Sequence, residues 1–198
     1  MTVPAMNDLI TLRAPPPKRA TKTGGDMEEH FYEAAIMLAY VSYLMDIHPE
    51  MTDLEIHPDG EHGKQFDIRG WLEGKGFQLT EPQGTTSYGG RYDNGNRSIL
   101  VSLKPGLGDV VGQLGNKKIV AECKGGILNT KHSGQKSKLR RGLCEAVGQL
   151  LSRDNDGEQQ FAVVPKTEDT LRLAERMRPR CLKAGIEIVL LNENGIPA

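Results

Sequence analysis

Cysteine is scarce in this sequence, which holds only Cys123, Cys144 and Cys181 among its 198 residues. The three are odd in number and far apart, and none forms a CxxC pair, so the sequence indicates neither a disulfide framework nor a structural zinc site. We therefore expect three reduced cysteines in the core of a cytoplasmic protein.

Long apolar runs and a strong charge imbalance are also missing. No stretch is apolar for long enough to span a bilayer, and the N-terminus lacks the features of a signal peptide, so no membrane partner is expected. The formal net charge of −1 excludes a uniformly basic surface but leaves room for a local basic patch. No G-x-x-x-x-G-K-[ST] phosphate loop is present, which argues against ATP hydrolysis.

The length favours one domain with a proper hydrophobic core. Residues 1–25 contain three consecutive prolines, several basic side chains and a Gly-Gly pair, and we expect a flexible N-terminal tail there. The domain proper is expected over residues 26–198. Its predicted first helix begins at Asp26 as N-cap, carries Glu28 and Glu29 in its first turn, and ends near Met45.

The most informative stretch runs from residue 108 to 126 and predicts two short strands joined by a tight turn at Gly115-Asn116. Gly-Asn favours two-residue hairpin turns, and such a turn sets the register of the two strands. In that register Asp109 lies opposite Glu122, and their side chains share a face. Lys124, two residues further along, joins the same face because side chains alternate along a strand.

Two carboxylates and a lysine are thus expected to project from one small area. Two carboxylates about 5 Å apart repel by roughly 3 kcal/mol at an effective dielectric constant of about 20. Protonation of one acid, the nearby lysine or a bound divalent cation could offset this repulsion. Mg²⁺ binds carboxylate oxygens while keeping several waters, and such a site can hydrolyse a phosphodiester.

Asp109, a gap of twelve residues and then Glu122-Cys123-Lys124 resemble the D…(D/E)xK signature of the PD-(D/E)xK nuclease superfamily. The first motif of that superfamily is often PD, whereas Gly108 precedes Asp109 here. The resemblance implies a Mg²⁺ ion, with Mn²⁺ as a substitute, held by Asp109, Glu122 and the backbone carbonyl of Cys123. Lys124 would orient or deprotonate the attacking water.

The resemblance implies two further site residues on helices. A supporting acid near the metal, on the first core helix, corresponds to Glu33, with Glu29 as the alternative, or Glu33 is simply a half-exposed residue near a helix start. A glutamine on the helix after the (D/E)xK strand, near the active site, corresponds to Gln149, which would contact water or phosphate or could instead be a surface residue. A tyrosine four residues later would mark the RecB-like subset, but Arg153 occupies that position.

A basic segment follows the hairpin. Five positive side chains without an acid lie within the eleven residues from 131 to 141, an arrangement that suits a polyanion or an ordinary solvated surface. They are Lys131, Lys136, Lys138, Arg140 and Arg141. The polar stretch 84–98, which contains Arg91, could be the tip of a long hairpin, and it is either a nucleic-acid-binding loop or a plain surface loop. Residues 48–63 hold three histidines and are expected to form a solvated loop in which Pro58-Asp59 is a coincidental match to PD.

The remaining pattern predicts a helix over residues 66–75, strands over 77–80, 98–103, 160–164 and 186–191, and amphipathic helices over 137–153 and 168–183. Leu139, Leu143, Ala146, Val147, Leu150 and Leu151 are expected to face inward from the first of these amphipathic helices. A strand, a helix and a strand at the end of the chain imply a parallel pair with a right-handed crossover. The whole order is typical of a three-layer α/β domain with a mixed central sheet. The resemblance names it the restriction-endonuclease-like αβββαβ core.

These expectations lead to a Mg²⁺-dependent nuclease that acts on DNA, for example in restriction or phage defence. A non-catalytic nucleic-acid-binding or assembly module with the same fold is the alternative, and a small-molecule phosphohydrolase is a third possibility. No recognition domain is evident, so we expect a homodimer or a protein partner that delivers the substrate.

Overall fold

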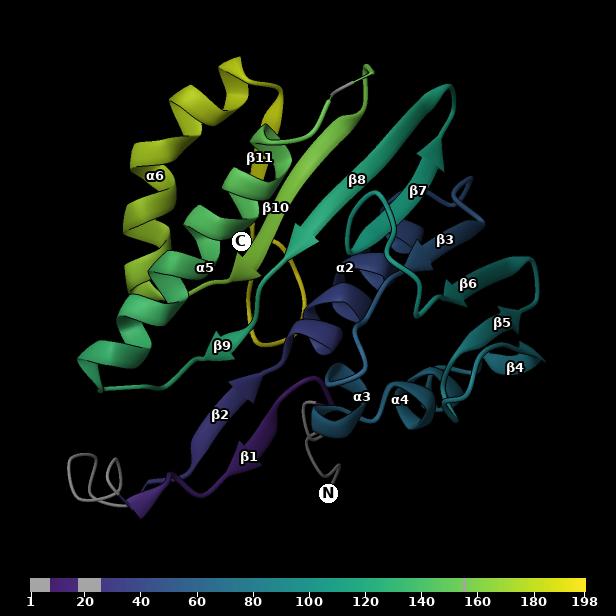
Figure 1. Cartoon of the computed structure of the whole chain (residues 1–198), viewed down its shortest axis with the longest axis horizontal. Helices are drawn as coiled ribbons and strands as arrows, with labels where there is room; N and C mark the ends of the chain where they lie inside the picture. Colours follow the sequence, from purple (N-terminus) through teal and green to yellow (C-terminus); the bar gives the residue numbers. More distant parts are fainter. Residues whose placement is uncertain (1–7, 18–25, 155) are drawn as a thin grey trace, which may run out of the picture.

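The structure is a computed structural model that describes residues 8–17, 26–154 and 156–198 (Figure 1). The strands are β1 Thr11–Arg13, β2 Glu28–Phe31, β3 Asp53–Ile56, β4 Gln78–Pro82, β5 Gly90–Asn94, β6 Arg97–Val101, β7 Val110–Leu114, β8 Lys117–Cys123, β9 Gly126–Ile127, β10 Gln159–Pro165 and β11 Ile186–Leu191. The helices are α2 Glu33–Ile47, α3 His62–Gln65, α4 Ile68–Gly74, α5 Ser133–Leu151 and α6 Glu168–Lys183. None of these described helices combines the length and apolar character needed to cross a bilayer.

A mixed sheet of eight strands, in the order β11-β10-β8-β7-β3-β6-β5-β4, forms the centre of the molecule. The β10 and β11 strands are parallel neighbours, as the strand–helix–strand pattern at the end of the chain predicts. The β8 strand is also parallel to β10, whereas β7 is antiparallel to both β8 and β3. A second sheet of three strands, β1-β2-β9, lies beyond one end of β8 (Figure 1).

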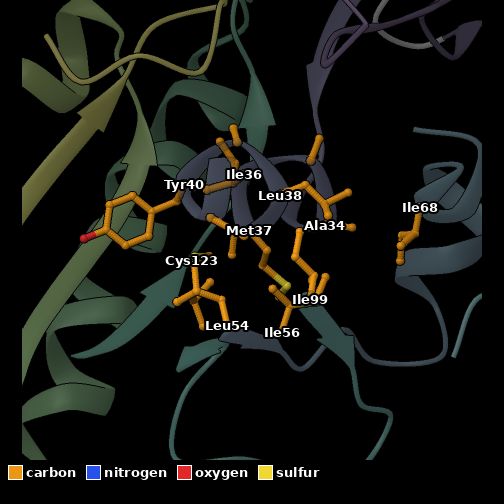
Figure 2. Close-up of a cluster of buried hydrophobic side chains, with 14 of the residues drawn as sticks. Ala34, Ile36, Met37, Leu38, Tyr40, Leu54, Ile56, Ile68, Ile99 and Cys123 are labelled. Carbon is orange, nitrogen blue, oxygen red and sulfur yellow. The ribbon is translucent and has the colours of Figure 1, made fainter. Parts of the chain in front are cut away.

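Helices cover both faces of the large sheet. Successive residues of β8 point to opposite faces and pack into different hydrophobic cores. Ile119, Ala121 and Cys123 pack into the core that contains α2, and Figure 2 shows Cys123 among the labelled core residues around that helix. Val120 packs into the other core, against α5 and α6. Glu122 has the same parity as Val120 and therefore lies on the α5 side. The expected three-layer α/β arrangement with a mixed sheet is confirmed.

The start of the domain differs from the prediction. Leu9 is buried in the core, and β1 pairs with β2, so the expectation of a free tail is wrong for residues 8–17. The rest of the predicted tail, 1–7 and 18–25, lies outside the described residues. The helix predicted from Asp26 begins at Glu33, because residues 28–31 form β2 between β1 and β9. A strand partner on each side outweighs the helical signal of the acidic residues.

Two stretches taken as loops contain sheet strands. Residues 48–63 include β3, a central strand of the large sheet, and residues 84–98 include β5 and the start of β6. The polar side chains of these stretches interrupt the apolar alternation that would predict a strand. They are tolerated in the sheet because neighbouring strands supply their partners. Two burial predictions are also wrong: Cys144 is exposed on α5, and Leu151 is exposed at its end, whereas the other inward positions predicted for this helix are buried.

Candidate active site

The β7–β8 hairpin has the predicted register. Leu114 pairs with Lys117 and Val111 with Val120, leaving Gly115-Asn116 as the two-residue turn, with Gly115 at φ 60°. The register ends at the pair of Val110 with Ala121, and its continuation by one residue places Asp109 opposite Glu122 at the open end of the hairpin. Gly108, where the superfamily often has proline, packs so tightly on β8 that a Cβ atom there would lie 2.8 Å from the Ala121 carbonyl oxygen. The backbone at this point has no room for the ring of a proline.

Asp109, Glu122 and Lys124 come together as expected. The Nζ atom of Lys124 lies 4.0 Å from Oδ2 of Asp109, and the Cys123 backbone N–H donates a 2.7 Å hydrogen bond to the same oxygen. Burial raises the pKa of Glu122 to about 7, and the charge of Asp109 adds to the rise. Burial also raises the pKa of Asp109. The charge of Asp109 therefore disfavours the ionised form of Glu122, whereas the Cys123 N–H and the Glu122 side chain lower the pKa of Asp109.

Glu33 joins this group from the first turn of α2. Its Oε1 atom lies 3.1 Å from Lys124 Nζ, and burial raises its pKa to about 7. The approach depends on Gly125, because a Cβ atom there would lie 2.5 Å from the Phe31 carbonyl oxygen and 2.6 Å from the Glu33 nitrogen. The close contact of residue 125 with the β2–α2 junction thus brings the lysine to Glu33. The alternative acid, Glu29, lies on β2 and not on a helix.

Lys124 is largely buried and faces carboxylates on several sides. Burial alone would lower its pKa, but the charges of Glu33, Asp109 and Glu122 outweigh that effect and raise it. Glu145 of α5 lies 3.9 Å from the ammonium group as well. The side chain is therefore a protonated ammonium group at neutral pH.

Arg153 is a site residue that the sequence analysis did not assign. Its Nη2 atom lies 2.5 Å from Oε1 of Glu122, a side chain that is only 2% exposed. Its Nη1 atom contacts the Leu107 carbonyl oxygen. Oε1 of Glu122 is buried and has no hydrogen bond of good geometry among the described residues, so its contact with Arg153 is an ion pair. The available signal was spacing: Arg141, Glu145, Gln149 and Arg153 recur every four residues and share one stripe of a helix.

His62 is a second residue that the sequence analysis left in a solvated loop. It opens α3, and its Nε2 atom lies 3.7 Å from Oε1 of Glu33. The Asp59 backbone N–H donates to Nδ1, so a neutral ring carries its proton on Nε2, directed to the Glu33 side. Burial lowers the pKa of His62, which favours this neutral form. Pro58-Asp59 thus helps to hold a residue of the site, although it does not supply the hairpin carboxylate.

Gln149 lies on the same α5 stripe, between Glu145 and Arg153. Its Oε1 atom is buried and lacks a hydrogen-bond partner among the described residues. The role of this amide in contacting water or phosphate stays a prediction.

The predicted nucleic-acid-binding residues separate into three groups. Lys138 and Arg141 line a groove that contains Lys124 and Glu33. Lys136 and Arg140 form ion pairs with Asp169 of α6, and Lys131 pairs with Asp26. Arg91 lies on β5, four strands from β8 in the sheet order, where it contacts Asp53 and Ser98. It is therefore not part of this site.

The donor chemistry of the site fits a hard divalent cation. Burial is the main cause of the raised pKa values of Asp109 and Glu122, a cation between the two carboxylates would offset its cost, and Mg²⁺ prefers such oxygen ligands. Over the described residues there is no group of three or more His, Cys, Asp or Glu side chains arranged to hold a metal. A cation here would thus need two carboxylates, a backbone carbonyl and water, and it would compete with Arg153 for Glu122.

Comparison of the chain with protein-family models, with curated proteins and with solved structures found no match. The residues of the site therefore carry the whole functional argument.

Proposed function

We propose that the protein is a divalent-metal-dependent nuclease of the PD-(D/E)xK type, with the restriction-endonuclease-like core, that hydrolyses phosphodiester bonds in DNA. The observation that carries the proposal is the convergence of Asp109, Glu122 and Lys124 at the end of one hairpin, with Glu33 added from α2. The order of α2, the hairpin, α5 and β10 along the chain supports the same reading.

Asp109 and Glu122, with the Cys123 carbonyl, would hold Mg²⁺ or Mn²⁺. Such a cation supplies Lewis-acid polarisation of the phosphate and of the attacking water. The Cys123 N–H and Lys124 orient Asp109 for this task. Arg153 balances the charge of Glu122 in the absence of the cation.

Lys124 and Glu33 have different roles in the proposed reaction because their protonation states differ. Because the pKa of Lys124 is raised, its ammonium group donates hydrogen bonds and offsets the charge that develops on the phosphate. Glu33, with a pKa of about 7, is suited to accept the proton of the attacking water near neutral pH. The neutral His62 ring donates from Nε2 and can hold Glu33 or a phosphate oxygen in place.

A non-catalytic nucleic-acid-binding module is the second candidate, because Glu122 is buried and paired with Arg153. A buried ion pair can serve the fold without any chemistry. This candidate predicts binding without cleavage under every metal tried.

The deciding experiment is a cleavage assay on plasmid DNA, linear DNA and RNA with Mg²⁺, Mn²⁺ or EDTA, using the wild type and Glu122→Gln. We expect cleavage that requires the metal and is lost in the variant. Cleavage in EDTA, or full activity of Glu122→Gln, would exclude the mechanism. A restriction or phage-defence role, and a homodimer or targeting partner, are later questions that depend on this result.

A further inference from the structure

A groove of about 820 Å³ lies over Lys124 and Glu33. Its walls come from the β1–β2–β9 sheet, the first half of α5 and the segment around α3, which converge beyond the end of β8 (Figure 1). The volume falls in the range of about 300–1,000 Å³ that is usual for pockets enclosing one small ligand. A groove of this size suits a few nucleotides of one strand, whereas a duplex would need a much wider surface.

The wall formed by the small sheet carries a stacked column of flat groups. The rings of His30 and Tyr32 stack with centroids 5.1 Å apart, and the guanidinium carbon of Arg13 lies 5.1 Å from the centroid of the Tyr32 ring. All three residues line the groove. Unpaired bases stack on aromatic rings and on arginine guanidinium planes, which makes this wall a platform for a base.

The α5 wall carries the cations that the fold leaves available. Lys138 and Arg141 line the groove, and neither forms an ion pair with a carboxylate of the described residues. Lys136 and Arg140 lie on the same helix, but Asp169 neutralises both. Phosphate groups would therefore be held by the first pair and not by the second.

The wall around α3 is lined by two acids, Asp59 and Glu61, of which Glu61 is paired with Lys64 and Asp59 lies beside the neutral His62 ring. Phosphates are repelled there and attracted to α5, so the charges define one path for a strand. A strand on this path would have its backbone along α5, its base against His30 and Tyr32, and a phosphodiester at Lys124.

We propose that the groove is the binding site for an unpaired stretch of polynucleotide, with its base on the Arg13–Tyr32–His30 column and its phosphates on Lys138 and Arg141. This inference rests on the proposed nuclease function and names its substrate class, which is a single strand or a frayed end and not an intact duplex.

The test is fluorescence anisotropy with a labelled 12-mer as single-stranded DNA, as single-stranded RNA and as blunt duplex DNA. Binding is measured in EDTA, where the wild type cannot cleave, and again with Ca²⁺. We expect either single strand to bind at least tenfold more tightly than the duplex, and the DNA and RNA arms show which sugar is preferred. Tyr32→Ala should weaken single-strand binding by about 5- to 150-fold, the range of one stacking interaction, while Tyr32→Phe retains it.

The charge argument has a matched control on the same helix. The double variant Lys138→Gln/Arg141→Gln should lower the slope of log affinity against log salt by about 1.4, since each phosphate contact on a single strand contributes about 0.7. Lys136→Gln/Arg140→Gln should leave the slope unchanged. Circular dichroism confirms that each variant is folded.

Equal or tighter binding of the duplex, no measurable binding of any 12-mer, or equal effects of the two double variants would overturn the inference. Its failure is distinguishable from that of the nuclease function. Single-strand binding without cleavage would reject only the nuclease function, and cleavage with a preference for duplex would reject only the groove assignment.

Discussion

Two hairpins of the large sheet turn at the same dipeptide, but the pKa values of their acidic side chains are shifted in opposite directions. The β5–β6 hairpin turns at Gly95-Asn96 and the β7–β8 hairpin at Gly115-Asn116, each with a glycine near φ +60°. On β5, the Asp93 carboxylate accepts a hydrogen bond from Thr80, which lowers its pKa. Beside β7 and on β8, burial raises the pKa of Asp109 and of Glu122.

The difference lies in what surrounds each hairpin. On the β5–β6 hairpin, Arg91 forms an ion pair with Asp53 and Arg97 forms one with Asp46. The β7–β8 hairpin instead brings its acids toward a third acid, Glu33, around one lysine. A two-residue turn thus sets only the register of its strands. The neighbouring helices decide whether the paired residues are satisfied or held under electrostatic strain, and strain of this kind is common at functional sites.

The largest expected effect comes from removing the ammonium group. Lys124→Met should lower the rate of metal-dependent cleavage by about 10²- to 10⁴-fold, the range of a positioned group that assists proton transfer or charge development. Arg91→Gln, on the other hairpin, should leave the rate within about twofold. Single-turnover kinetics with both variants measure this, and an equal loss in both would remove the distinction between the hairpins.

Metal binding should stabilise the protein through the β7–β8 acids. At a Mg²⁺ concentration about 100 times its Kd, binding adds about 2.7 kcal/mol to the free energy of unfolding, which corresponds to roughly 5–10 °C in Tm for a domain of this size. Glu122→Gln should lose this shift, whereas Asp93→Asn should keep it. Thermal scans with and without Mg²⁺ provide the measurement, and a shift that survives in Glu122→Gln would place the cation elsewhere.

Arg153 should compete with the cation. In Arg153→Gln the buried Glu122 loses its ion-pair partner, so the metal-free protein should be less stable and should bind Mg²⁺ several-fold more tightly than the wild type. Calorimetric titration with Mg²⁺ and thermal scans in EDTA test both parts. Weaker binding by the variant would mean that the arginine supports the metal site and does not oppose it.

The two hairpins should respond oppositely to pH. Glu33 and Glu122 have pKa values near 7 in the folded protein, against an ordinary value of 4.5, so the folded state binds more protons between these limits. Their contribution to stability is full below about pH 4.5 and is lost as the pH rises through 7. Asp93, with its lowered pKa, contributes above its ordinary value of 3.8 and loses that contribution as the pH falls.

Thermal scans in EDTA from pH 5 to pH 8 separate these contributions. The Tm of Glu33→Gln/Glu122→Gln should rise relative to the wild type as the pH increases. The Tm of Asp93→Asn relative to the wild type should stay constant over the same range. A constant difference for the double variant would show that these glutamates titrate normally.

The smallest expected effect concerns the turns themselves. Gly95 and Gly115 have positive φ angles and open space around the position of a Cβ atom, so alanine at either position costs about 1–2 kcal/mol through backbone conformation alone. Chemical denaturation should give similar losses for Gly95→Ala and Gly115→Ala. Cleavage should fall measurably only in Gly115→Ala, because only that register aligns the acids.

Local patterns in the sequence determined much of the fold. The register of the β7–β8 hairpin follows from its Gly-Asn turn, and α6 has its predicted bounds because its apolar stripe and N-terminal signals agree. The convergence of Asp109, Glu122 and Lys124 follows from that register. These features depend on residues close together in the chain, and the sequence alone therefore predicts them.

The tertiary structure alone decided which distant residues complete the site. Glu33 meets Lys124 because Gly125 packs on the β2–α2 junction, and Arg153 meets Glu122 because α5 crosses back over β8. It also separated the cations of α5 into those that Asp169 neutralises and those that line the groove. Long-range packing sets all three contacts, and the spacing of charged residues along a chain does not determine which partner each one finds.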